Sequence, residues 1–490
     1  MERCDVLVIG GGLLGCFAAR ALTAWNVSVR VLEAREDVCT GVSRANSGIV
    51  YAGYDTRPGT LKARMCVKAC QDFPRLCDAL GVRFFRCGSL MAAFGPTAER
   101  VLQKKLAQGR ENGVAGLRLL SAGEAYTMEP KLGPGLTTAL YAPGTGTVNP
   151  WELGIAAFEN ARDNGAAFCF SSPVQALRRA GDAYLAETPA ESYAARVVIN
   201  CAGLGADRVR ELVFPPAWRI VPTAGDYLVL DDTVSGFVRH VVFHEPEEKG
   251  KGLTLIPTVD GNLLIGPTER LWNGSADWAT AREGLESLAA LCRTVVPGLP
   301  LTEVIRSFAA LRPNPYAVRE ENGAWVPEHK SINGFAILEE DGLISLLGIK
   351  TPGLTCAAEL GKYAAEKAVH LLGGPGRNSR FRPERTAPPA VRDMEEKRRA
   401  ALTEACPEYG ELVCRCREIS RGEIMDAIRR GAATLDGVKR RTGAGMGRCQ
   451  GGRCMRQVLE ALAADRKLPP EKINRDGPDS PVVTGGYGAL

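Results

Sequence analysis

The chain has 490 residues, of which 45% are hydrophobic and 24% are charged, and its formal net charge is +5. This length suits two to four domains with a large core, and so slight a charge argues against nucleic acid as a partner. No apolar run approaches the ~20 residues of a membrane-spanning helix, and a strand predicted near the N-terminus leaves no room for a signal peptide. Sixteen cysteines in such a chain favour reduced thiols or metal ligation over disulfides, so we expect a cytoplasmic protein.

The first predicted elements form a strand–turn–helix–strand unit. Residues 5–9 predict a short buried strand, residues 10–15 form a glycine turn, and residues 16–25 carry apolar residues at helical spacing. Residues 27–32 predict a second strand that ends at Glu33. This order, with the acid in register, is typical of a dinucleotide site.

Each residue type in this unit has a physical role. Gly10 permits the tight turn, Gly12 lets the backbone approach a pyrophosphate, and Gly15 lets the helix pack closely on the strand. The helix N-terminus offers unpaired N–H groups to the pyrophosphate, and Glu33 would accept hydrogen bonds from the ribose hydroxyls. From these residues alone, NAD and FAD are both candidates.

The chain then leaves this unit and returns to it. Residues 39–53 form a loop whose short side chains can pass close to a flat ring system, although a surface loop also fits. Residues 82–138 predict short strands and an amphipathic helix, which indicates an excursion into a second domain. A predicted helix over 150–164 and buried strands over 166–170 and 196–200 indicate the return.

The second half predicts a separate sheet and then a final nucleotide-binding element. Residues 219–342 alternate strands with polar turns around one helix over 279–295, which favours an antiparallel sheet covered by helix. Residues 343–350 predict a last buried strand, followed by a Pro-Gly turn and a helix over 356–372. The N-terminus of that helix would point at the ligand.

Five segments of the chain together resemble FAD-dependent oxidoreductases of the D-amino-acid-oxidase type. They are residues 10–15 with Glu33, 43–53, 197–203, 311–313 and 348–355. The resemblance spans nearly all of residues 1–372 and implies FAD in place of NAD. Within the family, the chain is most similar to bacterial glycerol-3-phosphate dehydrogenases of the anaerobic large-subunit type. L-2-hydroxyglutarate dehydrogenases share residues 46–48 and 58–63 and are the alternative.

Four cysteines near the C-terminus form two close pairs, Cys414 with Cys416 and Cys449 with Cys454. Glycines beside them expose backbone N–H groups that suit cluster sulfurs. The segment resembles the bacterioferritin-associated-ferredoxin-like [2Fe–2S] domain, which implies that these four thiolates bind the cluster. Structural zinc also takes four thiolates and is the alternative. Nearby basic residues would offset the charge of the cluster: Arg415, Arg440, Arg441 and Arg448. Core packing fits other cysteines better, namely Cys66, Cys70 and Cys77.

The resemblance implies an α/β fold with a Rossmann-like, glutathione-reductase-like FAD-binding domain, an inserted α+β substrate domain and a small helical [2Fe–2S] domain. The expected FAD-binding domain comprises residues 1–81, 146–215 and 343–373, and the expected substrate domain comprises residues 82–145 and 216–342. A linker over 374–405 leads to the [2Fe–2S] domain over 406–468. Residues 469–490 are expected to form a mobile or partner-bound tail. The implied FAD-binding residues are Gly10, Gly12, Leu13, Leu14, Gly15, Glu33, Ala34, Ser43, Asn46, Ser47, Gly48, Val174, Ala202, Gly203, Gly348, Lys350, Gly353, Leu354 and Thr355.

The candidate catalytic residues follow from the chemistry and the resemblance. Flavin oxidation of a secondary alcohol needs hydride transfer to N5 and a base for the hydroxyl proton. A phosphate or carboxylate on the substrate needs a fixed cation. Arg312, at the end of a predicted strand, matches the substrate-anion arginine of the family, and Lys350 lies where related dehydrogenases place a lysine near the flavin. Tyr51 and Tyr227 stand where relatives often carry histidine, so the base stays open.

Other polar residues are weaker candidates. Arg270 is a second candidate for binding the phosphate. The histidines show no metal-ligand spacing and are expected to be structural or exposed, although His244 or His329 could approach the substrate from the second domain. The histidines are His240, His244, His329 and His370.

These motifs predict a dehydrogenase with two half-reactions. The resemblance implies a small anionic secondary alcohol, first of all sn-glycerol 3-phosphate, as the substrate that would reduce FAD. The [2Fe–2S] cluster would pass the electrons to a protein acceptor other than oxygen. That acceptor would be a second flavoprotein subunit or a membrane-linked protein, giving a hetero-oligomer or attachment to the inner face of the membrane. The alternatives are an L-2-hydroxyglutarate, amine or imino-acid dehydrogenase, and a non-enzymatic iron–sulfur sensor or scaffold.

Overall fold

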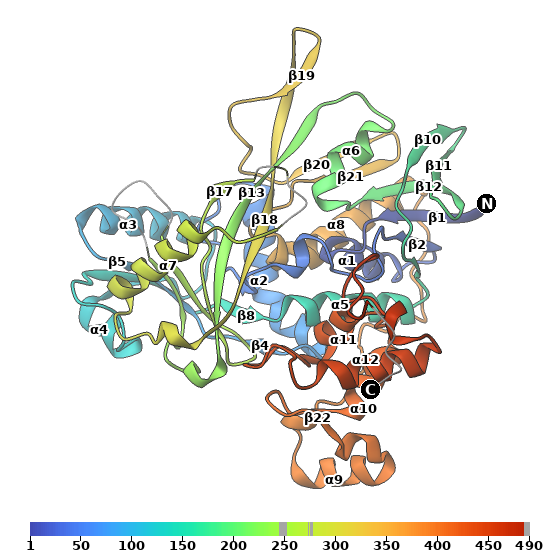
Figure 1. Cartoon of the computed structure of the whole chain (residues 1–490). Helices are drawn as coiled ribbons and strands as arrows, with labels where there is room; N and C mark the ends of the chain where they lie inside the picture. The colour runs from blue at the N-terminus through green and yellow to red at the C-terminus, as the bar shows by residue number, and fades with distance from the viewer. Residues whose placement is uncertain (245–251, 273, 275–277, 485–490) are drawn as a thin grey trace.

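The computed structural model describes residues 1–244, 252–272, 274 and 278–484 (Figure 1). Its first sheet runs, in spatial order, through β10 (Ala176–Ala180), β11 (Ala183–Glu187), β12 (Ser192–Asn200), β1 (Glu2–Ile9), β2 (Val29–Leu32) and β9 (Ala167–Cys169), with β21 (Leu343–Leu347) beside β12 and β20 (Ala336–Glu340) beside β21. The neighbouring strands β9, β2, β1, β12 and β21 are parallel, as in a Rossmann-like domain. The predicted α/β fold is therefore confirmed.

The apolar run that ends β1 is buried because both faces of this sheet are covered. Residues 6–9 are at most 4% exposed. On one face they pack with α1 (Leu13–Leu22), α5 (Pro150–Asp163) and α8 (Gly353–Leu371). On the other face they pack with the β10–β11 hairpin, which the sequence did not predict, and with α6 (Ala206–Glu211). The parallel strands consequently end at one edge, where their following loops meet.

The second sheet is mostly antiparallel and carries the elements expected for the substrate domain. In spatial order its strands are β19 (Ala324–Pro327), β18 (Val304–Glu321), β13 (Trp218–Leu230), β16 (Leu263–Ile265), β15 (Thr254–Pro257), β14 (Val241–His244), β5 (Ser89–Ala93), β7 (Thr138–Ala142) and β6 (Arg118–Ser121), with β17 (Arg270–Leu271) paired to β13. Helices pack on it: α3 (Pro96–Glu111), α4 (Ala122–Met128) and α7 (Arg282–Val295). Strands β13 and β18 pair along 13 residues of β13, and they carry side chains from this sheet to the edge of the first.

The C-terminal part has its own core and packs against the first unit. It comprises α9 (Glu396–Ala405), β22 (Leu412–Cys414), β23 (Ile419–Ser420), α10 (Arg421–Arg429), α11 (Leu435–Thr442) and α12 (Met455–Arg466). Helix α11 contacts α5, and this part lies at the bottom of Figure 1. The remaining elements are α2 (Leu61–Leu80), which packs on α5 and α8, and a small sheet of β3 (Ile49–Val50), β8 (Gly146–Val148) and β4 (Phe84–Phe85).

The expectation of a mobile or partner-bound tail is wrong for residues 470–484, which pack on the chain itself. Ile473 is 1% exposed in the C-terminal core. Asp476 accepts hydrogen bonds from Arg440 at 2.6 Å and from Arg44 at 2.7 Å. Residues 485–490 lie outside the described part. Helix α9 lies inside the predicted linker, and the sequence missed it because none of its residues is buried and no apolar face marks it.

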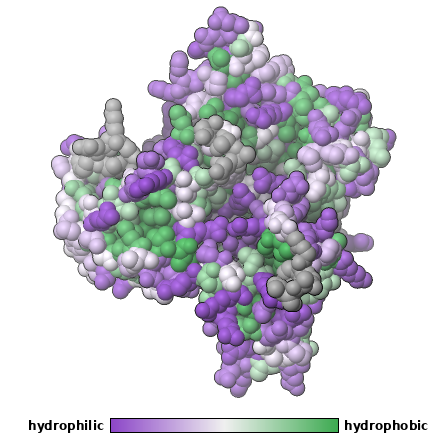
Figure 2. All heavy atoms as spheres, viewed as in Figure 1, coloured by the Kyte–Doolittle hydropathy of each residue, from purple (hydrophilic) through white to green (hydrophobic). Residues whose placement is uncertain are grey.

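The surface is mixed in character. Figure 2 shows hydrophilic residues over most of the face seen in Figure 1, with the largest apolar area on the lobe at the left, which carries α3, α4 and α7. The C-terminal lobe at the bottom is mainly hydrophilic on this face. Among the described helices, none is long and apolar enough to cross a bilayer.

The contact between α1 and α8 depends on a glycine, which gives a first prediction. A Cβ at Gly361 would lie 2.6 Å from the Phe17 carbonyl carbon. We expect Gly361→Ala to lower the free energy of unfolding by roughly 1–3 kcal/mol through overpacking, measured as a lower Tm. The control is Gly123→Ala in α4, where nothing lies within 4 Å of the added Cβ. It should raise stability by up to about 1 kcal/mol through helix propensity, and equal Tm changes in both variants would contradict the packing argument.

Candidate functional site

A cavity of about 470 Å³ opens where the parallel strands end. Its floor is the turn after β1, where Gly10 has φ +103° and a Cβ would lie 2.5 Å from the Cys201 carbonyl oxygen. A Cβ at Gly15 would lie 1.8 Å from the Gly10 carbonyl oxygen. Glycine is therefore required at both positions, and the exposed backbone leaves room for a phosphate group.

Glu33 and Ser43 fix the loops that border this turn. The Gly11 and Arg35 N–H groups donate to the Glu33 carboxylate at 2.6 and 2.9 Å. Burial raises the pKa of Glu33, while these two N–H groups act in the opposite direction. The Leu13 N–H donates to Ser43 Oγ at 3.1 Å. The acid predicted to bind ribose hydroxyls is thus held at the wall of the cavity.

Most of the predicted FAD-binding residues meet at this cavity. Those that line it are Gly10, Gly12, Leu13, Leu14, Glu33, Ala34, Ser43, Asn46, Ser47, Val174, Ala202, Gly203, Lys350, Gly353 and Leu354. Four others lie behind the wall: Gly15, Gly48, Gly348 and Thr355. The first three allow close backbone packing, and Thr355 Oγ1 accepts a hydrogen bond from the Tyr51 N–H at 3.0 Å. Sequence reasoning missed Arg35, Ser172 and Trp278, which also line the cavity but carry no motif signal.

All four predicted catalytic residues line the same cavity. Arg312 lies within β18, not at the end of a strand as expected, because β18 continues to Glu321. Its Nη1 donates to Glu269 Oε1 at 3.1 Å, and its side chain is 19% exposed. Lys350 Nζ donates to Asn314 Oδ1 at 3.0 Å and to Ser331 Oγ at 3.2 Å. Two cations therefore face one space, which suits an anionic ligand.

Burial changes the pKa values of the two tyrosines and of Lys350 in opposite directions. It raises the pKa of both Tyr51 and Tyr227, so their phenols keep the proton. It lowers the pKa of Lys350, and the charges of Lys62 and Arg312 lower it further. Lys62, on α2, is a cation that sequence reasoning did not assign, although it lies in the 58–63 motif. It is 7% exposed and donates to Asn333 Oδ1 at 3.2 Å.

The weaker candidates lie elsewhere. Arg270 contacts the Asp226 carboxylate at 3.5 Å and donates to the Ala279 carbonyl at 2.6 Å, away from the cavity lining. His240 Nδ1 lies 2.8 Å from the buried carboxylate of Glu129, which is a structural contact. All four histidines belong to the described residues, and they are absent from the lining of this cavity.

The four predicted ligand cysteines come together from two loops. Cys416 Sγ lies 3.9 Å from Cys414 Sγ and 3.8 Å from Cys449 Sγ. A hydrogen bond from Cys454 and a backbone N–H bond from Gly445 lower the pKa of Cys414 to about 5. Cys416 is exposed, whereas Cys414 and Cys454 are buried. One edge of this site therefore reaches the surface.

The loop around Gly447 fits a cluster cradle. A Cβ at Gly447 would lie 2.6 Å from Cys416 Sγ, so a side chain there would fill the space beside the sulfur. In the described residues, no three His, Cys, Asp or Glu side chains are placed to hold one metal ion together. A [2Fe–2S] cluster divides four thiolates between two irons, so it does not require such convergence.

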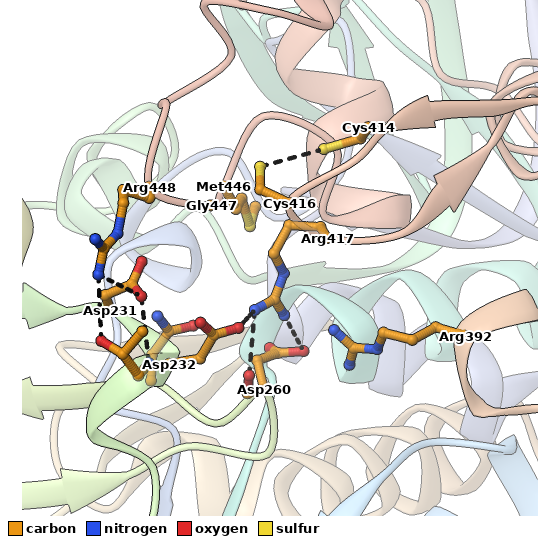
Figure 3. Close-up of polar contacts among 12 residues, drawn as sticks. Asp231, Asp232, Asp260, Arg392, Cys414, Cys416, Arg417, Met446, Gly447 and Arg448 are labelled. Atoms are coloured by element: carbon orange, nitrogen blue, oxygen red, sulfur yellow. Dashed lines mark hydrogen bonds and ion pairs between the residues drawn. The ribbon is translucent and has the colours of Figure 1, made fainter.

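Arginines dock the cysteine loops onto the substrate domain. Figure 3 shows Arg417 reaching from beside Cys416 to Asp232 and Asp260. Its Nη1 donates to Asp232 Oδ2 at 3.1 Å and to the Asp260 carbonyl at 3.2 Å, and its side chain is 6% exposed. Arg448 contacts Asp231 at 3.3 Å. Arg417 was not predicted, because its partners are more than 150 residues away in the chain.

Two arginines expected to offset the cluster charge have another role. Arg441 donates to both oxygens of Asp37 at 2.6 and 2.8 Å, and Arg440 pairs with Asp37 and Asp476. With Arg448 also paired to an acid, only Arg415 of the predicted set is exposed and without an ion pair in the described part of the chain. Charge compensation by these four arginines stays a prediction, and the structure shows that Arg440 and Arg441 also join the cysteine-bearing part to Asp37.

Comparisons with known proteins identify both parts. The model of the "FAD dependent oxidoreductase" family matches residues 5–367, about three quarters of the chain. The chain belongs to this family. The model "BFD-like [2Fe-2S] binding domain" matches residues 412–464, which contain all four cysteines. FAD and a [2Fe–2S] cluster are therefore the cofactors, and the zinc alternative is not supported.

Named relatives show which members of the family this chain is similar to. The chain is 37% identical over 483 residues to a glycerol 3-phosphate dehydrogenase of Caloramator mitchellensis, covering 98% of each chain. It is 29% identical over 280 residues to human mitochondrial L-2-hydroxyglutarate dehydrogenase, covering 54% of this chain and 60% of that one. The solved structure of FAD-bound L-alpha-glycerophosphate oxidase from Mycoplasma pneumoniae superposes with TM-score 0.71 at 25% identity, over 79% of this chain and 100% of that chain. The oxidoreductase is thus glycerol-3-phosphate-dehydrogenase-like.

The cysteine cradle gives the second prediction. We expect Cys416→Ser to lose the iron and the visible absorbance of the cluster while retaining one FAD per chain. The reason is that the cysteine loops and the first cavity lie in separate parts of the chain. Iron assay and flavin extraction measure this. The matched control is Cys406→Ser, which lies before the cysteine loops and should retain both groups. Full iron content in Cys416→Ser would remove Cys416 from the ligand set.

Proposed function

We propose that this protein is a dehydrogenase that oxidises sn-glycerol 3-phosphate to dihydroxyacetone phosphate and delivers the electrons, through its [2Fe–2S] cluster, to a protein acceptor. The observation that carries the proposal is the 37% identity to a named glycerol 3-phosphate dehydrogenase along 98% of both chains. That similarity extends over the iron–sulfur part, so it concerns the whole domain arrangement.

The cationic end of the cavity supports an anionic substrate. Arg312 can bind a phosphate with two N–H groups, and its present partner, Glu269, is half exposed. Lys62 adds positive charge nearby. A phosphate or carboxylate can compete with Glu269 for Arg312 and is attracted by Lys62, whereas a neutral alcohol gains neither interaction.

The oxidation also requires a proton acceptor beside the carbinol. When bound, FAD supplies the hydride acceptor and the cluster supplies a one-electron carrier. Of the four predicted catalytic residues, only Lys350 has a pKa shift that favours the proton-accepting form. Burial keeps the protons on the two tyrosines. We assign the base to Lys350 and hydrogen-bond donation to Tyr51 and Tyr227.

The acceptor is proposed from the exposed edge of the cysteine site. Cys416 reaches the surface, so a partner protein can approach the cluster there. A second flavoprotein subunit or a membrane-linked protein fits this role, in a hetero-oligomer. A direct oxidase would not need the cluster. If wild-type enzyme reduced oxygen as fast as a dye acceptor, this part of the proposal would be wrong.

The substrate is tested by anaerobic reduction of the bound flavin. We expect bleaching of the flavin absorbance by sn-glycerol 3-phosphate and slower or no bleaching by L-2-hydroxyglutarate, proline, sarcosine and glycine. Faster bleaching by L-2-hydroxyglutarate would favour the alternative hydroxyacid dehydrogenase. Bleaching by none of them would favour a sensor or scaffold.

The third prediction concerns Arg312. Removing one member of a partly buried charge pair costs about 2–5 kcal/mol, so Arg312→Ala should lower kcat/KM for glycerol 3-phosphate by roughly 100-fold. FAD content should not change. The control is Arg319→Ala, an exposed arginine on the same strand that pairs with Glu321. Unchanged kinetics in Arg312→Ala would remove this residue from the substrate site.

The fourth prediction is a pH dependence. Because the pKa of Lys350 is lowered, its neutral form increases as pH rises through a value below the ordinary 10.5. We therefore expect kcat/KM to rise with pH and level off above that value, measured by dye reduction. Lys350→Gln should lose both the rate and this inflection, while Lys367→Gln, on the exposed side of α8, should keep both. An inflection that persists in Lys350→Gln would assign the base elsewhere.

A further inference from the structure

A second cavity, of about 410 Å³, lies where three parts of the chain meet. Residues 44–47 come from the FAD-binding part, residues 305–309 of β18 from the substrate sheet, and Lys439 and Gln450 from the iron–sulfur domain. Residues 45–47 and Trp278 line both this cavity and the first one. The second cavity is therefore a neighbour of the flavin site that the proposed reaction does not use.

Two cations in the second cavity lack an anionic partner. Within the described residues, Lys439 Nζ makes neither an ion pair nor a hydrogen bond. Arg306, which is exposed, donates within the described part of the chain only to a neutral group, Gln450 Oε1, at 3.2 Å. Burial lowers the pKa of Lys439, and Arg306 is the strongest charge acting in the same direction, outweighing the attraction of Asp436. Two positive charges that line one cavity favour an anion between them.

Further donors in the lining also have no acceptor. Arg440 is 7% exposed, and its Nε makes no hydrogen bond. The buried Nε1 of Trp151, which can only donate, has no partner either. These statements cover the described part of the chain.

The acids of the lining do not neutralise these cations. Asp260 is held by Arg83 at 2.8 Å and by Arg417. Asp476 is held by Arg44 and Arg440. Asp436 lies 3.9 Å from Arg475, and its Oδ1 has no hydrogen-bond partner among the described residues. The lining holds four basic side chains, Arg44, Arg306, Lys439 and Arg440, against these three carboxylates, so its net charge is positive.

We propose that the second cavity binds a phosphate group, free or as the ester of a small molecule, between Arg306 and Lys439. This site is distinct from the substrate site. Arg306 and Arg312 are six residues apart on β18 and thus roughly 20 Å apart at the rise of a strand. Residues 305–309 line the second cavity and residues 310–313 the first. The bound group would contact both the substrate sheet and α11, and so would stabilise the docked iron–sulfur domain.

The fifth prediction tests this site by calorimetric titration of the FAD- and iron-loaded protein. Arg312→Gln serves as the background, so that the substrate site does not contribute. We expect one equivalent of inorganic phosphate or phenyl phosphate to bind and to raise the Tm. Adding Lys439→Gln or Arg306→Gln should weaken binding at least tenfold. Lys472→Gln, an exposed lysine of the same domain, is the matched control and should bind like the background.

A folding defect is distinguished by melting without phosphate. Lys439→Gln should then melt at or above the background, because the repulsion from Arg306 is removed, yet it should lose the rise in Tm on adding phosphate. Preference for inorganic phosphate over phenyl phosphate identifies a free ion as the ligand, and the reverse identifies an ester. No binding in the background, binding unchanged by both cavity variants, or equal binding of succinate would overturn the proposal. These outcomes do not depend on whether glycerol 3-phosphate bleaches the flavin.

Discussion

The buried ion pair between Asp37 and Arg441 holds the two redox parts of this chain together. The two terminal guanidinium nitrogens of Arg441 donate to Asp37, Arg440 approaches the same carboxylate at 3.4 Å, and all three side chains are at most 5% exposed. Burial alone raises the pKa of Asp37, but the two arginines reverse this shift and hold the pKa below its usual value. Removing one partner of such a pair costs about 3–5 kcal/mol, since a charge is left buried.

This pair matters because Asp37 lies in the loop that also borders the glycine turn after β1. Glu33 begins the loop and receives the Gly11 N–H. The Cys39 N–H, two residues after Asp37, donates to the Gly11 carbonyl at 2.9 Å. The glycine turn, the acid-bearing loop and α11 are therefore joined by direct bonds. The position of the cluster domain relative to the first cavity therefore depends on the same backbone that forms the glycine turn.

The sequence predicted the features that depend on neighbouring residues. The glycine turn with Glu33 and the paired cysteines are local patterns, and each corresponds to a compact arrangement in the structure. The features that the sequence did not predict depend on contacts between residues that are far apart in the chain. Arg441 reads as a basic residue near a cluster until its partner, 404 residues away, is known. The length of β18, and hence the place of Arg312, depends on pairing with β13. Tail residues such as Ile473 show no pattern until the C-terminal core that buries them is assembled.

The same long-range packing determines which groups near the flavin hold protons. Desolvation disfavours whichever form is charged, so it keeps Tyr51 and Tyr227 neutral with the proton on and drives Lys350 towards neutrality with the proton off. In the part of the chain that the structure describes, no histidine lines this cavity, so its two phenols and one half-buried amine are the groups on which this separation acts. Under the proposed function, the amine of Lys350 would take the proton of the alcohol. Arg312 and Lys62 contribute to this separation, since each positive charge they place near Lys350 further favours its neutral form.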